Sequence, residues 1–336
     1  MGTFFKRMLL LLSCVIISAC SDNGASDDKA ATMNDVKEAA RDIIGNNAFL
    51  YYKNYDEAVK FYGKILGFKN VFEFPGFAVI YQTSPTTFIT LVNDDGSGRG
   101  MHSADEPKTI AIALLTDQID GWYQYAESRN LNIKSPPKPL GDSPHNGFLV
   151  TDPGGYILEF EHFAPHAENV KFMPLLEKAE NIFSDPYAES SRPMDLGFKA
   201  SIYWLYHKDA KEAADFYRDV MGLEKIVEQP FSDIYTSSRT GYIGLVLDGV
   251  GIHSATHEKA VNVGFLTSNA QAWYDHLKNE PTFKLRTKDL FHEADEDGTV
   301  LIDIVIGYDP DNYYIEIDQF LDEEANKAIR AAVGQE

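Results

Sequence analysis

The sequence has very little cysteine and no long hydrophobic run. Its two cysteines, Cys14 and Cys20, both lie within the first 20 of its 336 residues. The remainder of the chain therefore has no internal disulfide, no thiolate metal cluster and no cysteine nucleophile. The main apolar stretch, residues 8–17, has about ten residues, whereas a membrane-spanning helix needs roughly 20.

Positive charge is scarce, and the common catalytic motifs are missing. The formal net charge is −21 at pH 7, so we expect the chain to be repelled by nucleic acids and by anionic lipid surfaces. It has no glycine-rich phosphate loop, no HExxH zinc motif and no Gly-x-Ser-x-Gly nucleophile elbow. The sequence therefore gives no support to nucleotide binding, zinc proteolysis or α/β-hydrolase chemistry.

The first 20 residues do have the composition of an export signal. Lys6 and Arg7 precede the apolar residues 8–17, and the small residues Ser18 and Ala19 follow. A charged start, a short apolar core and a small-residue end are typical of a secretory signal peptide rather than a membrane span. We therefore predict a signal peptide over residues 1–20.

The end of this signal resembles the lipobox of bacterial lipoproteins. Residues 17–20 read ISAC, which implies that Cys20 carries a lipid and that the protein is anchored in the cell envelope. Ser21 stands where an Asp would favour the inner membrane, so we expect the outer membrane, facing the periplasm. The alternative is an ordinary cleaved signal in which Cys20 has no role. Residues 21–46 are polar, which predicts a flexible tether.

The rest of the chain contains an internal repeat. The segment DEAVKFY at residues 56–62 returns as KEAADFY at 211–217. Three further pairs follow in the same order: MHSA at 101–104 and IHSA at 252–255, GWY at 121–123 and AWY at 272–274, and DPGGY at 152–156 and DPDNY at 309–313. A period this long does not indicate a solenoid, so it predicts two homologous domains in tandem.

Each repeat predicts the same succession of strands and helices. The elements expected in the first repeat are, in order, strand 47–53, helix 58–66, strands 77–81 and 88–92, strand 110–114, helix 119–131, and strands 147–150 and 156–160. The second repeat shows the same plan between residues 201 and 317. We therefore predict domains over 47–163 and 200–320, a linker with a short helix over 164–199, and a C-terminal helix or tail over 321–336.

Both ends of the first domain resemble the vicinal oxygen chelate superfamily, which includes glyoxalase I, extradiol dioxygenases and bleomycin-resistance proteins. The opening strand and helix around Phe61 and Tyr62 are similar to its first unit, and residues 152–159 (DPGGYILE) to its closing strand with a metal-binding Glu. The resemblance implies an α+β fold of tandem glyoxalase-like domains. Each domain would contain two βαβββ units that form a curved mixed-sheet cup around a ligand.

The resemblance also locates four metal-ligand positions in each copy. They hold Asn47, Thr90, Thr109 or Ala111, and Glu159 in the first copy, and Ile202, Gly244, Ala260 or Asn262, and Glu316 in the second. Basic nitrogen and oxygen donors bind divalent ions, and only the two glutamates qualify. We therefore expect no metal and no other cofactor, with a divalent metal as the alternative.

Four side chains are candidates for catalysis: Glu159, Glu316, His102 and His253. The histidines stand at matching positions before a strand, and are either displaced ligands, acid–base groups or plain loop residues. Their acidic neighbours differ between the copies, which favours loop residues. The glutamates are either inherited scaffold or groups that accept hydrogen bonds or protons from a ligand.

Strand alternation adds aromatic residues to the expected ligand pocket. Phe49 and Tyr51 share a face with Asn47, and Trp204 and Tyr206 share one with Ile202. Rings with polar tips suit an apolar or planar ligand that has a few polar groups. The predicted pocket residues are Asn47, Phe49, Tyr51, Thr90, Glu159, Trp204, Tyr206 and Glu316.

Two classes of function remain. The first is a lipid-anchored protein that binds a small organic ligand without a catalytic metal. The second is a divergent glyoxalase I-like lyase or dioxygenase that acts on a small carbonyl or aromatic compound. The poor metal-ligand positions favour binding, with the membrane contacted only through the lipid. The sequence leaves open whether the two domains form separate cups or share strands.

Overall fold

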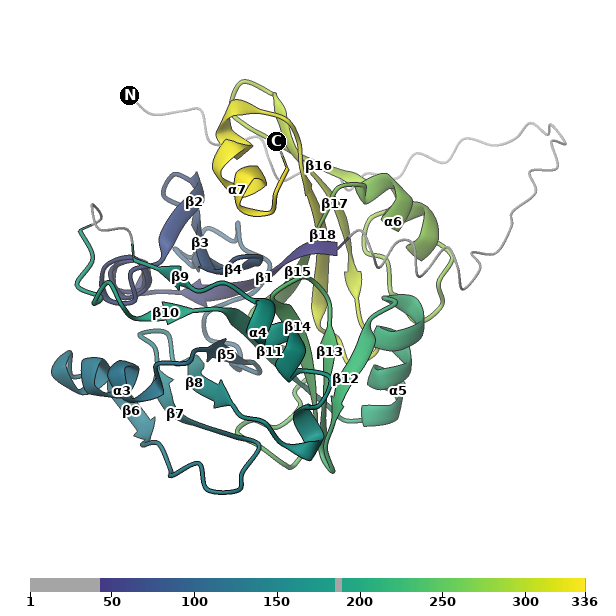
Figure 1. The fold of residues 1–336 in the computed structure, drawn as a ribbon. Coiled ribbons are helices and arrows are strands. Elements are labelled where there is room, and N and C mark those ends of the chain that lie inside the picture. The colour runs from purple at the N-terminus through teal and green to yellow at the C-terminus, as the bar shows by residue number, and fades with distance from the viewer. Residues whose placement is uncertain (1–42, 185–188, 336) are drawn as a thin grey trace, which may run out of the picture.

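The computed structural model describes residues 43–184 and 189–335, which form four βαβββ units and two capping segments (Figure 1). The expected signal peptide, Cys20 and most of the expected tether lie outside the described residues. Residues 43–46, which we expected in the tether, instead begin the first strand and are largely buried. No helix in the described part of the chain is long and apolar enough to cross a membrane.

The first repeat contains two units. The first unit consists of β1 (Ile43–Tyr52), helix α2 (Tyr55–Val59), the π-helical turn η1 (Lys60–Ile65), β2 (Lys69–Phe74), β3 (Ala78–Ser84) and β4 (Thr87–Asn93). The second consists of β5 (Ala111–Leu115), α3 (Ile119–Ser128), β6 (Asn132–Ser135), β7 (His145–Thr151) and β8 (Ile157–Phe163). A short segment follows, with η2 (Ala167–Asn169), α4 (Met173–Lys178), β9 (Ile182–Phe183) and β10 (Gly197–Phe198).

The second repeat has the same order of elements. Its first unit consists of β11 (Ala200–His207), α5 (Ala210–Asp215), the π-helical turn η3 (Phe216–Val220), β12 (Glu224–Glu228), β13 (Ser232–Thr236) and β14 (Gly241–Leu247). Its second consists of β15 (Val261–Thr267), α6 (Ala270–Leu277), β16 (Phe291–Ala294), β17 (Val300–Tyr308) and β18 (Tyr314–Phe320). The chain continues into η4 (Glu324–Asn326) and α7 (Lys327–Ala332).

The two repeats exchange units to build two eight-stranded sheets. Sheet A has the strand order β16-β17-β18-β15-β1-β4-β3-β2, and sheet B has the order β12-β13-β14-β11-β5-β8-β7-β6. At the centre of each sheet, two strands from different repeats pair antiparallel: β1 with β15 in sheet A, and β5 with β11 in sheet B. The α+β fold of tandem βαβββ units is confirmed. However, each sheet combines one unit from each repeat, so the cups are shared.

A network of buried hydroxyl groups joins the two sheets. The backbone N–H of Thr86 donates to Oγ1 of Thr240 (2.9 Å), and the N–H of Thr240 donates to Oγ1 of Thr86 (3.0 Å). Asn46 Nδ2 donates to Oγ of Ser237 beside them (2.7 Å). Thr86 follows β3 and Thr240 follows the equivalent strand β13. This reciprocal pair therefore joins matching positions of the two repeats.

Each sheet has an inner and an outer face. On β1, the outer side chains Ala48, Leu50 and Tyr52 join a large core that also includes side chains of the helices α3 and α6. The inner faces form separate apolar clusters, one on each sheet. These inner faces are the two cups, which we call cup A on sheet A and cup B on sheet B.

A short helix covers each cup at one end. Phe172, next to α4, is fully buried in the cluster of cup B, and Ile329 of α7 is fully buried in that of cup A. The preceding asparagines, Asn169 and Asn326, hold both caps in the same way. Each donates from Nδ2 to two backbone carbonyls at distances of 2.7–2.9 Å. Figure 1 shows α7 beside β2 and above the strands of sheet A.

Candidate functional site

The centre of cup A holds a polar cluster formed by four strands. Asn47 of β1 donates from Nδ2 to Oγ1 of Thr90 on β4 (2.7 Å). Asn262 of β15 donates from Nδ2 to Oε1 of Glu316 on β18 (2.6 Å), and its Oδ1 accepts from the Tyr51 hydroxyl (2.8 Å). We call these five residues the amide cluster. They are at least nine-tenths buried, so a strongly apolar setting strengthens their hydrogen bonds.

Two acidic side chains of β18 face cup A. Burial, with a smaller contribution from Glu293, raises the pKa of Glu316 to about 7. Burial and the neighbouring Glu316 raise the pKa of Asp318 well above its usual range, and Oδ1 of Asp318 is buried without a hydrogen-bond partner among the described residues. Glu316 therefore exchanges its proton close to neutral pH, which suits it to donate or accept a proton or a hydrogen bond.

His102 lies at the edge of the amide cluster. Its ring packs edge-on against Tyr51 and Tyr314, with centroid distances of 5.5 and 5.8 Å. Its Nδ1 contacts Oε2 of Glu106 (2.8 Å), and burial lowers its pKa. Its Nε2 is buried and has no hydrogen-bond partner in the part of the chain that the structure describes. His102 is therefore more than a surface loop residue, because it forms part of the aromatic wall beside the cluster.

The centre of cup B is apolar. The three positions that match Asn47, Thr90 and Asn262 hold Ile202, Gly244 and Ala111, and Trp204 lies directly over Gly244. A Cβ atom on Gly244 would lie 2.0 Å from Cε3 of Trp204. The indole ring therefore occupies the space that a side chain on β14 would need. Apolar packing in cup B takes the place of the hydrogen-bonding side chains that lie at the centre of cup A.

Carboxylates remain on the inner face of cup B. Burial, and then the nearby Glu161, raise the pKa of Glu159 to about 8. Glu161 contacts Nδ1 of His145 through Oε1 (2.7 Å), and this contact raises the pKa of His145. His253 packs edge-on against Tyr206 at 5.2 Å, with a pKa lowered by burial. Its position therefore mirrors that of His102 in cup A.

The structure regroups the residues expected in the pocket. Asn47, Phe49, Tyr51 and Thr90 share sheet A with Glu316, whereas Trp204 and Tyr206 share sheet B with Glu159. Asn47 and Glu159 of the first copy therefore lie in different cups, because β1 pairs with β15 rather than with β5, and this answers the question of separate or shared cups that the sequence left open. The alternatives Ala260 and Asn262 are also resolved, since the Asn262 side chain contacts Glu316.

The aspartates of the two DP motifs form buried clasps that the sequence did not single out as functional. Asp152 accepts hydrogen bonds from the hydroxyls of Tyr52 (2.5 Å) and Tyr62 (2.8 Å). Asp309 accepts from the Tyr217 hydroxyl (3.1 Å) and contacts Nε2 of His207 (2.9 Å).

Each aspartate also caps its own turn through two backbone N–H groups. Because Tyr52 belongs to sheet A and Asp152 follows a strand of sheet B, the first clasp ties the sheets together. The second clasp also joins the sheets, because His207 belongs to sheet B and Asp309 follows a strand of sheet A. These residues therefore have a structural role.

The amide cluster does not fit a catalytic metal ion. Such a site generally needs three protein ligands, and Glu316 carries the one carboxyl group of the cluster. Across residues 43–184 and 189–335, no three His, Cys, Asp or Glu side chains lie close enough to share an ion.

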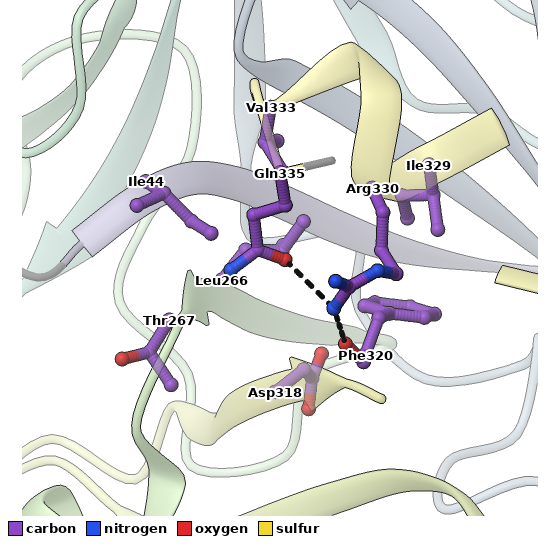
Figure 2. Close-up of a pocket in the computed structure, with 9 residues that line it drawn as sticks. All are labelled: Ile44, Leu266, Thr267, Asp318, Phe320, Ile329, Arg330, Val333 and Gln335. Atoms are coloured by element: carbon purple, nitrogen blue, oxygen red, sulfur yellow. Dashed lines mark hydrogen bonds between the residues drawn. The ribbon is translucent and has the colours of Figure 1, made fainter. Parts of the chain in front are cut away.

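The capped ends of the two cups differ in free volume. Under α7, the volume between helix and sheet is about 0 Å³. Figure 2 shows Arg330, Val333 and Gln335 filling this region, with Nη1 of Arg330 donating to the carbonyl of Phe320 (2.9 Å). Under α4, the equivalent region is a cavity of about 340 Å³. The duplicated caps therefore close one cup and leave the other partly open.

Comparison with known proteins agrees with this architecture. Residues 45–160 match the model of the Glyoxalase/Bleomycin resistance protein/Dioxygenase superfamily. A putative dioxygenase from Bacillus subtilis has a similar structure, with a TM-score of 0.59 and 14% identity over 88% of this chain and 91% of that one. Among proteins with curated functions, no significant sequence match was found.

Glyoxalase I from Zea mays is also similar over nearly its whole length. A variant of that protein has a TM-score of 0.58 and 13% identity, over 88% of this chain and 99% of that one. A second structure of glyoxalase I from Zea mays gives 0.52 and 15%, over 85% and 94%. Identities this low establish the fold alone. The first repeat therefore belongs to the Glyoxalase/Bleomycin resistance protein/Dioxygenase superfamily, and the chain as a whole has a tandem glyoxalase-like fold.

Proposed function

We propose that the protein binds a small organic molecule at the amide cluster of cup A without a catalytic metal. The observation that carries this proposal is the chemistry of the cluster. Asn47, Thr90 and Asn262 supply neutral donors and acceptors at positions where the superfamily's metal enzymes have ligands, and Glu316 adds a group that titrates near pH 7. Such a set of side chains suits the recognition of a polar group on a ligand better than the binding of an ion.

The surroundings of the cluster support the same function. Tyr51, Tyr314 and His102 pack edge-on around it, and the Arg286 guanidinium lies over the Tyr314 ring at 5.4 Å and donates to its hydroxyl (2.7 Å). Aromatic rings bury the apolar part of a ligand while their hydroxyls and the amides orient its polar atoms. This combination is typical of small-molecule sites.

Metal content and retained ligands test the proposal together. Full-length protein purified with detergent should contain well below one equivalent of Zn, Ni, Fe or Mn by elemental mass spectrometry. Small molecules released on denaturation should be lost with Glu316→Gln and retained with Glu159→Gln, the matched change in cup B. Near-stoichiometric metal that disappears with Glu316→Ala would contradict the proposal. Ligand loss with Glu159→Gln alone would move the site to cup B.

A second candidate function follows from the pKa of Glu316. A carboxyl with a pKa of about 7 is able to act as a general base at neutral pH. The alternative is therefore a lyase or another enzyme that removes a proton from a small carbonyl compound with Glu316. Slow exchange of the α-hydrogens of such a compound for deuterium, abolished by Glu316→Gln, would favour this enzyme over a binding protein.

We further propose that a lipid on Cys20 anchors the protein in the outer membrane, facing the periplasm. The support is the export signal that ends in ISAC and the Ser at position 21. Replacing Cys20 with Ala should release the protein from the membrane fraction or leave an unprocessed precursor. If the Cys20→Ala protein is processed normally and still sediments with membranes, the lipid anchor is excluded.

A further inference from the structure

The cavity under α4 lies away from the centre of either cup. It is bounded by the ends of β5 and β8, by α4, and by Lys199 at the start of the second repeat. Its volume of about 340 Å³ falls in the range of small-ligand sites. Leu115, Phe163, Met173 and Leu176 provide apolar walls, so the cavity is suited to an occupant with an apolar body.

One polar side chain in this cavity has an unsatisfied atom. Glu161 lines the cavity and is only 5% exposed. Its Oε1 contacts His145, whose ring stacks on Phe163, but its Oε2 is buried and has no hydrogen-bond partner among residues 43–184 and 189–335. A buried carboxylate oxygen left unpaired costs free energy. A hydrogen-bond donor supplied from within the cavity would remove that cost.

The charges around the cavity favour a cation as this donor. Lys199 is paired with Asp117, with Nζ and Oδ2 2.6 Å apart. Glu161 is paired with His145 through one oxygen only. Glu177 of α4 adds an acidic side chain at the rim. The balance of these groups is negative, so an anion would be repelled and an ammonium or guanidinium group attracted.

In cup A, a guanidinium group of the chain itself lies in the equivalent region. Under α7, the position that matches Met173 is occupied by Arg330, and Asp318 takes the place of Glu161. The aliphatic part and guanidinium of Arg330 lie along the cap, with Nη1 bonded to the Phe320 carbonyl (Figure 2). One repeat thus places its own organic cation in a region that the other repeat leaves open.

We propose that the cavity under α4 binds a small organic cation, an ammonium or guanidinium group on an apolar body. The charged group donates to Oε2 of Glu161, and the body packs against Phe163, Met173 and Leu176. This site is independent of the function proposed above, because it uses none of the amide cluster.

Calorimetric titration of the full-length protein with 2-phenylethylammonium tests the site, with 2-phenylethanol as the neutral analogue of matched shape. We expect the ammonium to bind about tenfold or more tightly than the alcohol, since a charge-assisted hydrogen bond contributes roughly that factor. Glu161→Gln should weaken ammonium binding by a similar factor. The matched control is Asp318→Asn in cup A, which should leave the affinity unchanged.

A second variant keeps the test decisive if Glu161→Gln lowers stability. Met173→Arg copies the arrangement of cup A and should abolish ammonium binding, because the new side chain, like Arg330 in cup A, fills the space between the cap and the sheet. Thermal unfolding should show that Met173→Arg remains folded. Equal affinity for ammonium and alcohol, no binding of either, or full binding by Met173→Arg would each overturn the proposal.

Discussion

Cup A and cup B are built from equivalent strands, but their centres and their capped ends differ in opposite ways. Cup A is polar at its centre, where the amide cluster lies, and is filled at its capped end by Arg330 and Val333. Cup B is filled at its centre by Trp204 and open at its capped end. The polar side chains of cup A are thus buried at its centre, whereas the free volume of cup B lies at its capped end.

The largest expected effect concerns the two clasps. Asp309→Ala should reduce the free energy of unfolding by about 3–5 kcal/mol, because it leaves His207 buried without a charged partner. His207 and Asp309 are both fully buried, and Nδ1 of His207 already lacks a partner in the described part of the chain.

Asp152→Ala should cost less, about 2–3 kcal/mol. The hydroxyls of Tyr52 and Tyr62 are 3.3 Å apart and can still hydrogen-bond to each other. Urea unfolding of both variants measures the difference. Equal losses would mean that the turn caps, rather than the His or Tyr partners, dominate both clasps.

The packing of Trp204 gives a second, smaller contrast. Gly244→Ala should destabilise the protein by about 2–3 kcal/mol, since its Cβ would overlap the indole ring. The matched change in cup A, Thr90→Ala, removes a hydroxyl from the amide cluster and should cost about 1 kcal/mol. Adding Trp204→Phe to Gly244→Ala should recover part of the loss in thermal unfolding. No recovery would show that the clash lies elsewhere.

The smallest expected effect is the pH dependence of the two strand glutamates. Their pKa values in the folded protein, about 8 for Glu159 and about 7 for Glu316, exceed the ordinary value of 4.5. Folding therefore takes up protons, and the stability that they contribute is complete below about pH 4.5. It is lost progressively as the pH rises to between 7 and 8.

Replacing either glutamate with Gln should remove the loss of stability that its ionisation causes at high pH. Between pH 5 and pH 9, Glu159→Gln should gain stability relative to the original protein, and Glu316→Gln should gain less, because its pKa is raised less. Urea unfolding at both pH values provides the measurement. A larger gain for Glu316→Gln would reverse our ranking of the two cups.

Much of the fold could be predicted because its central strands and helices have strong patterns. The strands of the two eight-stranded sheets that were missed are β2, β6, β12 and β16. These four are the outermost strands of the two sheets, where half of the side chains face solvent and the apolar alternation is weak. The exchange of units between repeats could not be predicted, since β5 and β15 offer β1 similar apolar partners.

The candidate site could be predicted only in part for the same reason. Asn47, Thr90 and Glu316 were named from their positions, but their meeting in one cup depends on the pairing of β1 with β15. A signal for the caps was present and overlooked: Asn169 follows β8 and Asn326 follows β18 at equal distances. The cavity beneath α4 depends on side-chain volumes across elements, which no local pattern records.

The pairing of strands across repeats also has a consequence for how the chain acquires its structure. Sheet B needs only residues 111–247, whereas sheet A must wait until residues 261–320 can join residues 43–93. One sheet is thus nested within the other along the sequence. During synthesis or export, β1 presents an unpaired edge until β15 arrives, and such edges are prone to aggregate. We therefore expect slow folding with an early sheet-B intermediate, and a dependence on chaperones that hold the N-terminal unit.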